Sequence, residues 1–150
     1  MKLCAYVAGR LGEVTADDVS KLDVINLAFG TLKDGLLIYP AAEEAKAEIV
    51  RWKQTNPALK VLLSIGGWGA GGFSTMARTE AGIAAFAESA VEMTKKIGLD
   101  GIDLDWEYPT IGSAGIDYAP EDKENFTALL GSLRDALTWL HRKIDMDYVN

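Results

Sequence analysis

The sequence contains few of the residues from which disulfide frameworks and histidine metal sites are built. Its single cysteine, Cys4, cannot form a disulfide within the chain, and its single histidine, His141, cannot build a histidine metal site alone. Cys4 lies in the apolar run from Leu3 to Ala8, and we expect it to be a buried core thiol. His141 lies near the expected end of a helix, where we expect a favourable contact with the helix dipole.

Positive charge and long apolar runs are also scarce. The 150 residues include 15 lysines and arginines against 22 aspartates and glutamates, a net charge of −7, which disfavours nucleic acid and anionic membranes as partners. No run of about 18 apolar residues occurs, and no signal-type cleavage pattern follows Met1. We therefore expect a cytoplasmic protein with no nucleic-acid or membrane partner, built as a single domain over residues 1–150.

Short apolar runs alternate along the chain with segments of helical periodicity. The apolar runs predict strands at residues 2–8, 23–30, 60–67 and 102–108. Capping residues and helical spacing predict helices at residues 15–21, 41–55, 80–97 and 121–142. This alternation indicates an α/β fold with parallel strands joined by right-handed crossovers. Two architectures fit: an open doubly wound sheet, and the leading half of a (β/α)8 barrel, whose complete form takes about 250 residues.

The stretch from Asp100 to Pro109 sets four carboxylates among large apolar side chains. If residues 102–108 form a strand, its side chains alternate between two faces. The acidic face then carries Asp103, Asp105 and Glu107, and the apolar face carries Ile102, Leu104 and Trp106. Crowded carboxylates raise one another's pKa, which suits a site that must hold a proton near neutral pH. A solvated or structural acidic strand is the alternative at this point.

The same stretch resembles a known family signature. It contains the pattern Asp100-x-x-Asp103-x-Asp105-x-Glu107, followed by Tyr108-Pro109. This pattern resembles the signature of the family 18 glycoside hydrolases, the chitinases. The resemblance implies the first four βα units of a (β/α)8 TIM barrel. It also implies hydrolysis of chitin or related β-1,4-linked N-acetylglucosamine oligosaccharides without a cofactor. In this family the substrate's own acetamido group acts as the nucleophile.

The resemblance implies a role for each acidic residue. Glu107 would protonate the leaving oxygen, Asp105 would orient the attacking acetamido group, and Asp103 would share a proton or hydrogen bond with Asp105. Because catalytic groups of barrels lie at the carboxyl ends of strands, Glu107 would lie at the rim and Asp103 deeper in the lumen. Asp100 breaks the alternation of faces, and we expect it to anchor the turn before the strand.

A second stretch, Ser64-Ile-Gly-Gly-Trp68, resembles another signature of the same family. The resemblance implies that Ser64 hydrogen-bonds the deep aspartate and that Trp68 stacks on a sugar near the cleft. It places further substrate-binding residues at Tyr6, Phe29, Gly67 and Tyr108. From the residues alone, Tyr6 and Phe29 fit ordinary core positions equally well.

Two rival interpretations stay open. The segment from Gly67 to Gly72 follows a strand and matches the G-x-G-x-x-G pattern of a dinucleotide-binding oxidoreductase domain. Against this, Trp68 stands where a pyrophosphate would approach, and we expect the next helix only from Thr79. The second rival is a Mg²⁺ or Ca²⁺ site, because hard oxygen donors are provided by Asp103, Asp105 and Glu107.

The sequence departs from the family pattern after Leu140. The fifth strand and helix of the family have no counterpart there, and Asp147-Tyr-Val-Asn150 resembles the stretch that precedes the family's strand-six motif. A four-stranded half-barrel leaves two unpaired edges and an uncovered lumen face. We therefore expect either a homodimer of two halves or marginal stability. A noncatalytic carbohydrate-binding half-barrel is the alternative to an active enzyme.

Overall fold

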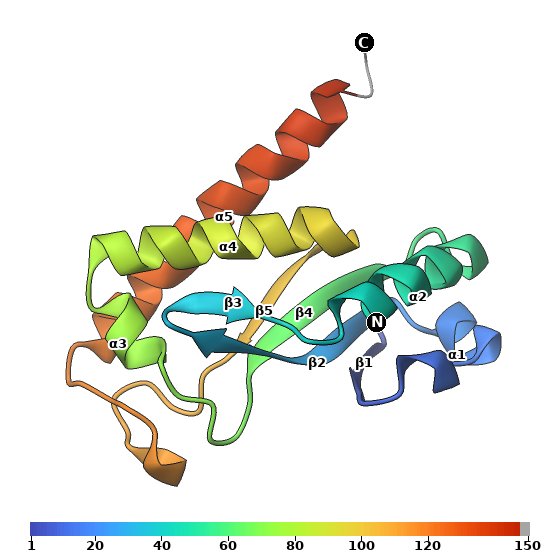
Figure 1. Cartoon of the computed structure of the whole chain (residues 1–150). Coiled ribbons are helices and arrows are strands. Elements are labelled where there is room, and N and C mark those ends of the chain that lie inside the picture. Colours follow the sequence, from blue (N-terminus) through green and yellow to red (C-terminus); the bar gives the residue numbers. More distant parts are fainter. Residues whose placement is uncertain (148–150) are drawn as a thin grey trace.

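The structure, a computed structural model, describes residues 1–147, with side chains for residues 1–142. Four parallel strands form a sheet in the order β1-β2-β4-β5, and β3 pairs antiparallel with the end of β2 (Figure 1). The strands are β1 Cys4–Ala8, β2 Val24–Lys33, β3 Leu36–Ile38, β4 Lys60–Gly66 and β5 Gly101–Asp105. The helices are α1 Ala16–Lys21, α2 Ala42–Thr55, α3 Phe73–Ala77, α4 Glu80–Ile97 and α5 Asp122–Asp147, with 3-10 turns at Leu11–Glu13 and Ser113–Gly115.

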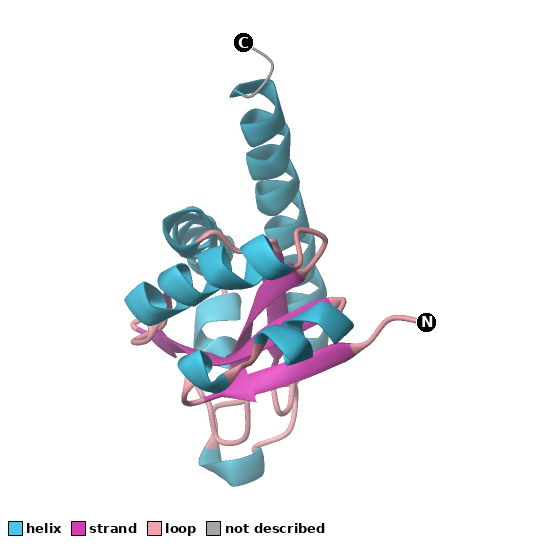
Figure 2. Ribbon diagram, turned by 90° about the vertical axis from the view of Figure 1, so that its right-hand side faces the viewer, coloured by secondary structure: helices cyan, strands magenta, loops and turns pink. Residues whose placement is uncertain are grey.

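The order of the parallel strands decides between the two architectures. Each strand pairs with the next parallel strand along the chain, and the order does not reverse. A doubly wound sheet requires a reversal, whereas crossovers that all run in one direction curl the sheet toward a barrel. The chain forms the first four βα units of a (β/α)8 barrel, and the doubly wound alternative is wrong. The three longest helices accordingly lie on one side of the strands (Figure 2).

The core lies between the sheet and these helices. Alternate residues of β2 and β4 face the helices and are buried, and side chains from the helices pack against them. The largest fully buried side chains include Ile25, Leu27, Leu63, Ile65, Trp52, Phe73, Phe86 and Leu129. Burying one such side chain contributes about 1.5–3 kcal/mol, so this face supplies most of the hydrophobic stabilisation.

The helix starts follow capping residues that the sequence displays. Thr15 and Asp18 form a capping box before α1, in which the Asp18 N–H donates to Thr15 Oγ1 at 3.1 Å and the Thr15 N–H donates to Asp18 Oδ2 at 3.0 Å. Thr79 accepts from the Gly82 N–H at 3.0 Å at the start of α4. These side chains satisfy first-turn N–H groups that have no partner within the helix. Both predicted helix starts are confirmed.

Two short elements were not expected. β2 continues to Lys33 and turns through Asp34 (φ 52°) and Gly35 (φ 77°) into β3. Two positive φ angles in a two-residue connection suit a tight hairpin, whereas the strand was predicted to end at residue 30. The helix α3 follows Gly72 directly, so the expectation that helix begins only from Thr79 is wrong.

Two predicted boundaries are also wrong. β5 ends at Asp105 rather than at residue 108, because its partner β4 ends at Gly66 and leaves residues 106–108 without a neighbouring strand. The helix α5 continues to Asp147, so His141 lies within it and not at its end. The segment at residues 147–150 resembles the stretch that precedes the family's strand-six motif. Its residues 148–150 lie outside the described residues. Within residues 1–147, no strand follows β5 and no helix is long and apolar enough to cross a membrane.

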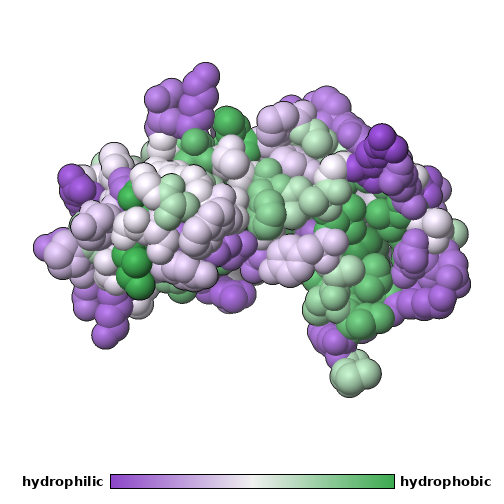
Figure 3. Space-filling model, turned by 90° about the horizontal axis from the view of Figure 1, so that it is seen from below, coloured by the Kyte–Doolittle hydropathy of each residue, from purple (hydrophilic) through white to green (hydrophobic). Residues whose placement is uncertain are grey.

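The side of the sheet opposite the helices is open. Cys4, Tyr6 and Ala8 share this side of β1, and all three are exposed. The expectation that Cys4 is a buried core thiol is wrong, because β1 is an edge strand and nothing in the described chain covers this side of it. Seen from below, apolar atoms gather in a patch on the side of β1 and α1 (Figure 3). On the opposite face of β1, which Ala5 and Val7 share, a groove of about 410 Å³ lies beside α1, with an apolar lining from Leu3, Ala5, Val7, Val14 and Leu22.

Candidate active site

Asp103 is the centre of a hydrogen-bonded group on the open side of the sheet. Ser64 on β4 lies opposite Asp103 on β5 in the strand register, and the Ser64 hydroxyl donates to Asp103 Oδ2 at 2.7 Å. The Tyr6 hydroxyl reaches across from β1 and donates to the same oxygen at 3.0 Å. Two donors on one oxygen hold the carboxylate in a single orientation. The hydrogen bond from Ser64 that the resemblance implied is therefore present.

Asn26 on β2, which was not predicted as a site residue, belongs to the same group. It lies beside Tyr6 in the strand register and is only 8% exposed. Burial and the Asp103 carboxylate raise the pKa of Tyr6, against a smaller lowering by a hydrogen bond with Asn26. Tyr6 therefore stays protonated at neutral pH and can donate to Asp103. The only signal in the sequence was one polar residue inside the apolar run of β2.

Asp105, at the end of β5, carries a proton more readily than an ordinary aspartate. Burial raises its pKa, and so do the negative charges of Glu107 and Asp103. The three carboxylates are thus electrostatically coupled, as their crowding in the sequence predicts. A proton or hydrogen bond shared between Asp103 and Asp105 stays a prediction.

Two glycines allow β4 to approach the acidic strand closely. At Gly66 (φ 123°) a Cβ atom would lie 2.1 Å from the Asp105 carbonyl oxygen, and the Gly67 N–H donates to that same oxygen at 2.9 Å. At Gly67 (φ 90°) a Cβ atom would lie 3.3 Å from the ring of Phe29. Any larger residue would clash at Gly66, would crowd Phe29 at Gly67, and would strain the backbone at both positions. Gly66 therefore allows the close approach of β4 to the backbone of Asp105.

Glu107 lies where the chain leaves the sheet. Its neighbour Trp106 is buried on the helix side, where it stacks on Phe73 with ring centroids 5.2 Å apart. Glu107 is half-buried on the other side, where its charge acts on Asp105. A hydrogen bond with Glu107, together with its charge, raises the pKa of Tyr108. The peptide bond between Glu107 and Tyr108 is cis, as is that between Ala28 and Phe29.

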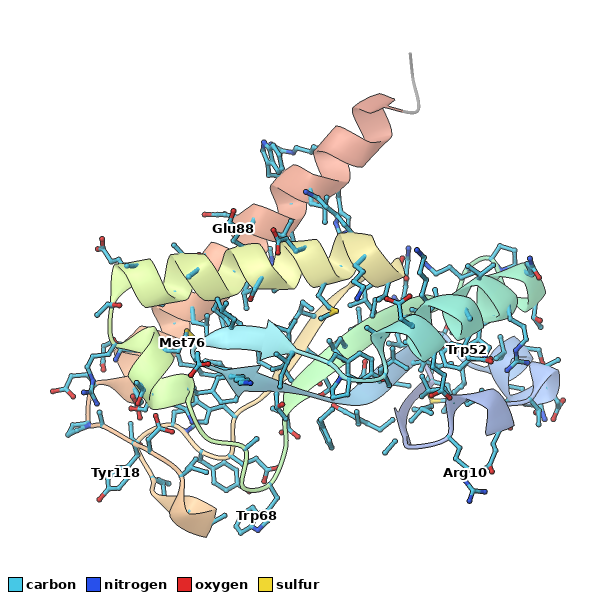
Figure 4. The ribbon with its side chains drawn as sticks, in the orientation of Figure 1. Arg10, Trp52, Trp68, Met76, Glu88 and Tyr118 are labelled. Atoms are coloured by element: carbon cyan, nitrogen blue, oxygen red, sulfur yellow. The ribbon has the colours of Figure 1, made fainter. Side chains whose placement is uncertain are left out.

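Aromatic side chains surround these acids. Tyr6 and Phe29 contact each other with ring centroids 6.5 Å apart, and Trp68 meets Tyr108 edge to face at the same separation. Trp68 is 69% exposed and projects downward from the loop after β4 (Figure 4). An aromatic ring that offers its flat face to solvent beside hydrogen-bonding groups suits a ligand that is apolar on one face and polar at its edges, as a sugar ring is.

Asp100 lies before β5 and away from this group. Its carboxylate pairs with Lys53 at 2.7 Å and Lys60 at 3.1 Å, and accepts from the Val61 N–H at 2.9 Å. Burial alone would raise the pKa of Asp100, but the hydrogen bonds from these three donors outweigh it and lower the pKa. The residue therefore ties the start of β5 to α2 and β4.

The structure argues against both rival interpretations. Among the described side chains, no group of three Asp, Glu, His or Cys residues is placed to hold a metal ion. In the glycine-rich loop, the Gly72 and Thr75 N–H groups that a phosphate would need at the start of α3 already donate to the Asp117 carboxylate. α3 is also only five residues long.

Parallel strands in barrel order with carboxylates at a strand's carboxyl end define the (β/α)8-barrel class of enzyme folds. The model of the family "Glycosyl hydrolases family 18" matches residues 3–149, and the chain belongs to this family. The chain is similar to chitinase A1 of Niallia circulans, at 47% identity over 92 residues, and to a probable endochitinase of Caenorhabditis elegans, at 37% identity over 137 residues. These alignments cover 60% and 89% of this chain.

The structure is similar to that of a family 18 N-acetylglucosaminidase from Paenibacillus barengoltzii, with a TM-score of 0.92 and 44% identity over 97% of this chain. The match covers 43% of that enzyme's chain. The alignments with the two curated relatives cover 13% and 19% of their lengths. The chain therefore spans less than half of the length of the proteins that it resembles.

Proposed function

We propose that this chain hydrolyses chitin or related β-1,4-linked N-acetylglucosamine oligosaccharides by substrate-assisted acid catalysis. The observation that supports the proposal most strongly is the coupled group of Asp103, Asp105 and Glu107 on the open side of the sheet, with Asp103 held by Ser64 and Tyr6. The relatives' names, chitinases and an N-acetylglucosaminidase, support the choice of substrate.

In the proposed reaction, Glu107 donates its proton to the glycosidic oxygen as the bond to the anomeric carbon breaks. The acetamido oxygen of the same sugar attacks that carbon and forms a cyclic oxazolinium ion. Asp105 accepts a hydrogen bond from the acetamido N–H and stabilises the positive charge. Water then opens the ring, and Glu107 takes a proton from that water, which restores the starting state.

The residues around the acids contribute by fixing position. The hydrogen bonds to Asp103 hold its carboxylate in one orientation, and the close approach at Gly66 holds the backbone of Asp105 in place. Trp68 and Tyr108 would pack on the sugar rings that flank the cleaved bond. Catalysis depends on such preorganised surroundings, because misplacement by about 1 Å can lower the rate about a hundredfold.

A noncatalytic carbohydrate-binding role is the second candidate. It is favoured by the uncovered side of the sheet, because the described residues provide four barrel strands and substrate would be held from one side only. Binding through Trp68 needs fewer groups than hydrolysis does.

Chitotetraose distinguishes the two candidates. We expect the chain to bind it with a change in tryptophan fluorescence and to release shorter oligosaccharides, detected by mass spectrometry. Trp68→Ala should abolish the fluorescence change, whereas Trp139→Ala, at a similarly exposed tryptophan on α5, should retain it. Binding without cleavage would favour the carbohydrate-binding role, and neither binding nor cleavage would contradict both candidates.

We further propose that two copies pair through their open edges. β1 and β5 are the two unpaired edges of one parallel sheet, so a twofold axis would place each β5 beside the partner's β1. A groove of about 430 Å³ beside β5, at the opposite edge from the apolar groove beside β1, has both an apolar and a polar lining. The apolar part is formed by Ile102, Leu104, Leu130, Leu133 and Leu137, and the polar part includes Asp100, Arg134 and His141. The exposed face of α5 would cover the partner's β1 groove.

Light scattering tests this pairing. We expect a mass near twice 16.2 kDa, reduced to that of a monomer by Leu130→Asp. Val50→Asp, at an exposed apolar residue on α2, is the matched control and should leave the dimer intact. A monomer that melts cooperatively would contradict the pairing.

A further inference from the structure

Two loops carry the residues proposed to meet the sugar. The loop between β4 and α3 carries Trp68, and the long loop between β5 and α5 carries Glu107 and Tyr108. Close to the ends of their strands, Trp68 and Tyr108 touch only edge to face. Contacts further along the two loops join them more firmly.

Asp117 makes the first such connection. From the β5–α5 loop, its Oδ1 accepts from the Gly72 N–H at 2.6 Å, and its Oδ2 accepts from the Thr75 N–H at 2.7 Å. Burial would raise the pKa of Asp117, but these backbone donors outweigh it and lower the pKa, so the carboxylate stays ionised at neutral pH. Both of its oxygens are thus committed to the start of α3, immediately after the loop with Trp68.

Asp122 makes the second connection. It is fully buried, and its Oδ1 accepts from the Ser74 hydroxyl on α3 at 2.8 Å. Its Oδ2 accepts from the Ala119 N–H at 2.7 Å and the Thr110 N–H at 3.3 Å, both within the β5–α5 loop. One carboxylate therefore ties α3 to the two halves of that loop.

The glycine-rich segment provides the space for these contacts. At Gly71 a Cβ atom would lie 3.3 Å from Asp117 Oδ1, and at Gly69 it would lie 3.9 Å from the Ala114 side chain. Gly72 has a φ of 95° where it precedes α3. The pattern that resembled a dinucleotide fingerprint thus serves the approach of one loop to the other.

We propose that Asp117 and Asp122 are positioning residues that set the gap between Trp68 and Glu107, and with it the width of the cleft that receives the sugar chain. The claim that a sugar chain binds in this cleft rests on the proposed function. The coupling of the two loops rests on these hydrogen bonds alone. Neither aspartate touches the reacting atoms.

Fluorine NMR of 5-fluorotryptophan-labelled protein tests the coupling without any ligand. The chain has four tryptophans, and Trp68→Phe identifies the signal of Trp68. We expect Asp117→Asn to shift or broaden that signal while the signal of the core residue Trp52 stays in place. Asp117→Ala, which removes both acceptors, should cause the larger change.

Asp18→Ala is the matched control, since it removes a carboxylate that accepts two hydrogen bonds from Thr15 at the distant start of α1. It should lower the melting temperature and leave the Trp68 signal unmoved. An unmoved Trp68 signal in folded Asp117→Asn protein would overturn the inference.

Chitotetraose affinity then tests the consequence for the cleft. We expect Asp117→Asn to weaken binding on the order of tenfold, because it misplaces Trp68 relative to Glu107. Unchanged affinity beside a shifted Trp68 signal overturns the claim about cleft width. A shifted signal in a protein whose wild type binds no chitotetraose supports the coupling of the loops and contradicts the proposed function.

Discussion

The two sides of the sheet are built from neighbouring residues of the same strands, yet they differ in almost every property. The helix side presents Ile25, Leu63 and Ile65, which are fully buried against the helices. The open side presents Tyr6, Ser64 and Asp103, which form a polar group without helical cover. The alternation of side chains along each strand produces this contrast.

The difference separates stability from chemistry. Apolar packing on the helix side supplies the folding free energy, whereas the open side gathers carboxylates that repel one another. Substitutions on the helix side should therefore reduce stability, and substitutions on the open side should alter function with little loss of stability.

The largest expected effect comes from the core. Phe86→Ala on α4 leaves a cavity behind the sheet, and we expect the free energy of unfolding to fall by about 3–5 kcal/mol in urea denaturation. Phe29→Ala on the open side is the matched control, with an expected loss of about 1 kcal/mol or less. Similar losses for both would remove the distinction between the two sides.

An intermediate effect is expected at Asp100. Asp100→Asn weakens its bonds to Lys53 and Lys60, and we expect a loss of about 1–3 kcal/mol at pH 7. Because the pKa is lowered on folding, this stabilisation is present above the unfolded pKa of about 3.9 and is lost as the pH falls through the folded value. Thermal melts of both proteins from pH 7 to pH 2 should converge at the acidic end, and a constant difference would contradict this origin.

The smallest effect, of opposite sign, is expected at Asp105. Its pKa is raised on folding, so its ionisation disfavours the folded state once the pH exceeds the unfolded value. Asp105→Asn should raise the melting temperature slightly at pH 7 and have no such effect below about pH 3.9. A lower melting temperature at pH 7 would show that the acidic group is stabilising after all.

Features that depend on nearby residues could be predicted from the sequence. The short apolar runs marked the parallel strands, and Thr15 and Thr79 marked the helix starts. The alternation within residues 100–109 placed three acids together, and the family signature identified Ser64 as a partner of Asp103.

Features that depend on distant contacts could not be predicted. The role of Asp122 rests on Ser74, 48 residues earlier, so its acidic character suggested only the start of a helix. Cys4 lies in an apolar run, but its exposure is decided by what covers the edge strand. The helix α3, at five residues, is too short for a periodic pattern to reveal it. The hairpin of β2 with β3 is local, and its Asp34-Gly35 turn was a signal that the prediction of strands missed.

Glu107→Gln tests the central claim, that the open side of the sheet carries an acid catalyst, most directly. The substrate is a fluorogenic chitobioside, and the matched control is Glu121→Gln, at an exposed glutamate of the same loop. We predict a measurable rate for the wild type and for Glu121→Gln, and loss of that rate in Glu107→Gln protein that melts as the wild type does. Equal rates from all three proteins would contradict the claim.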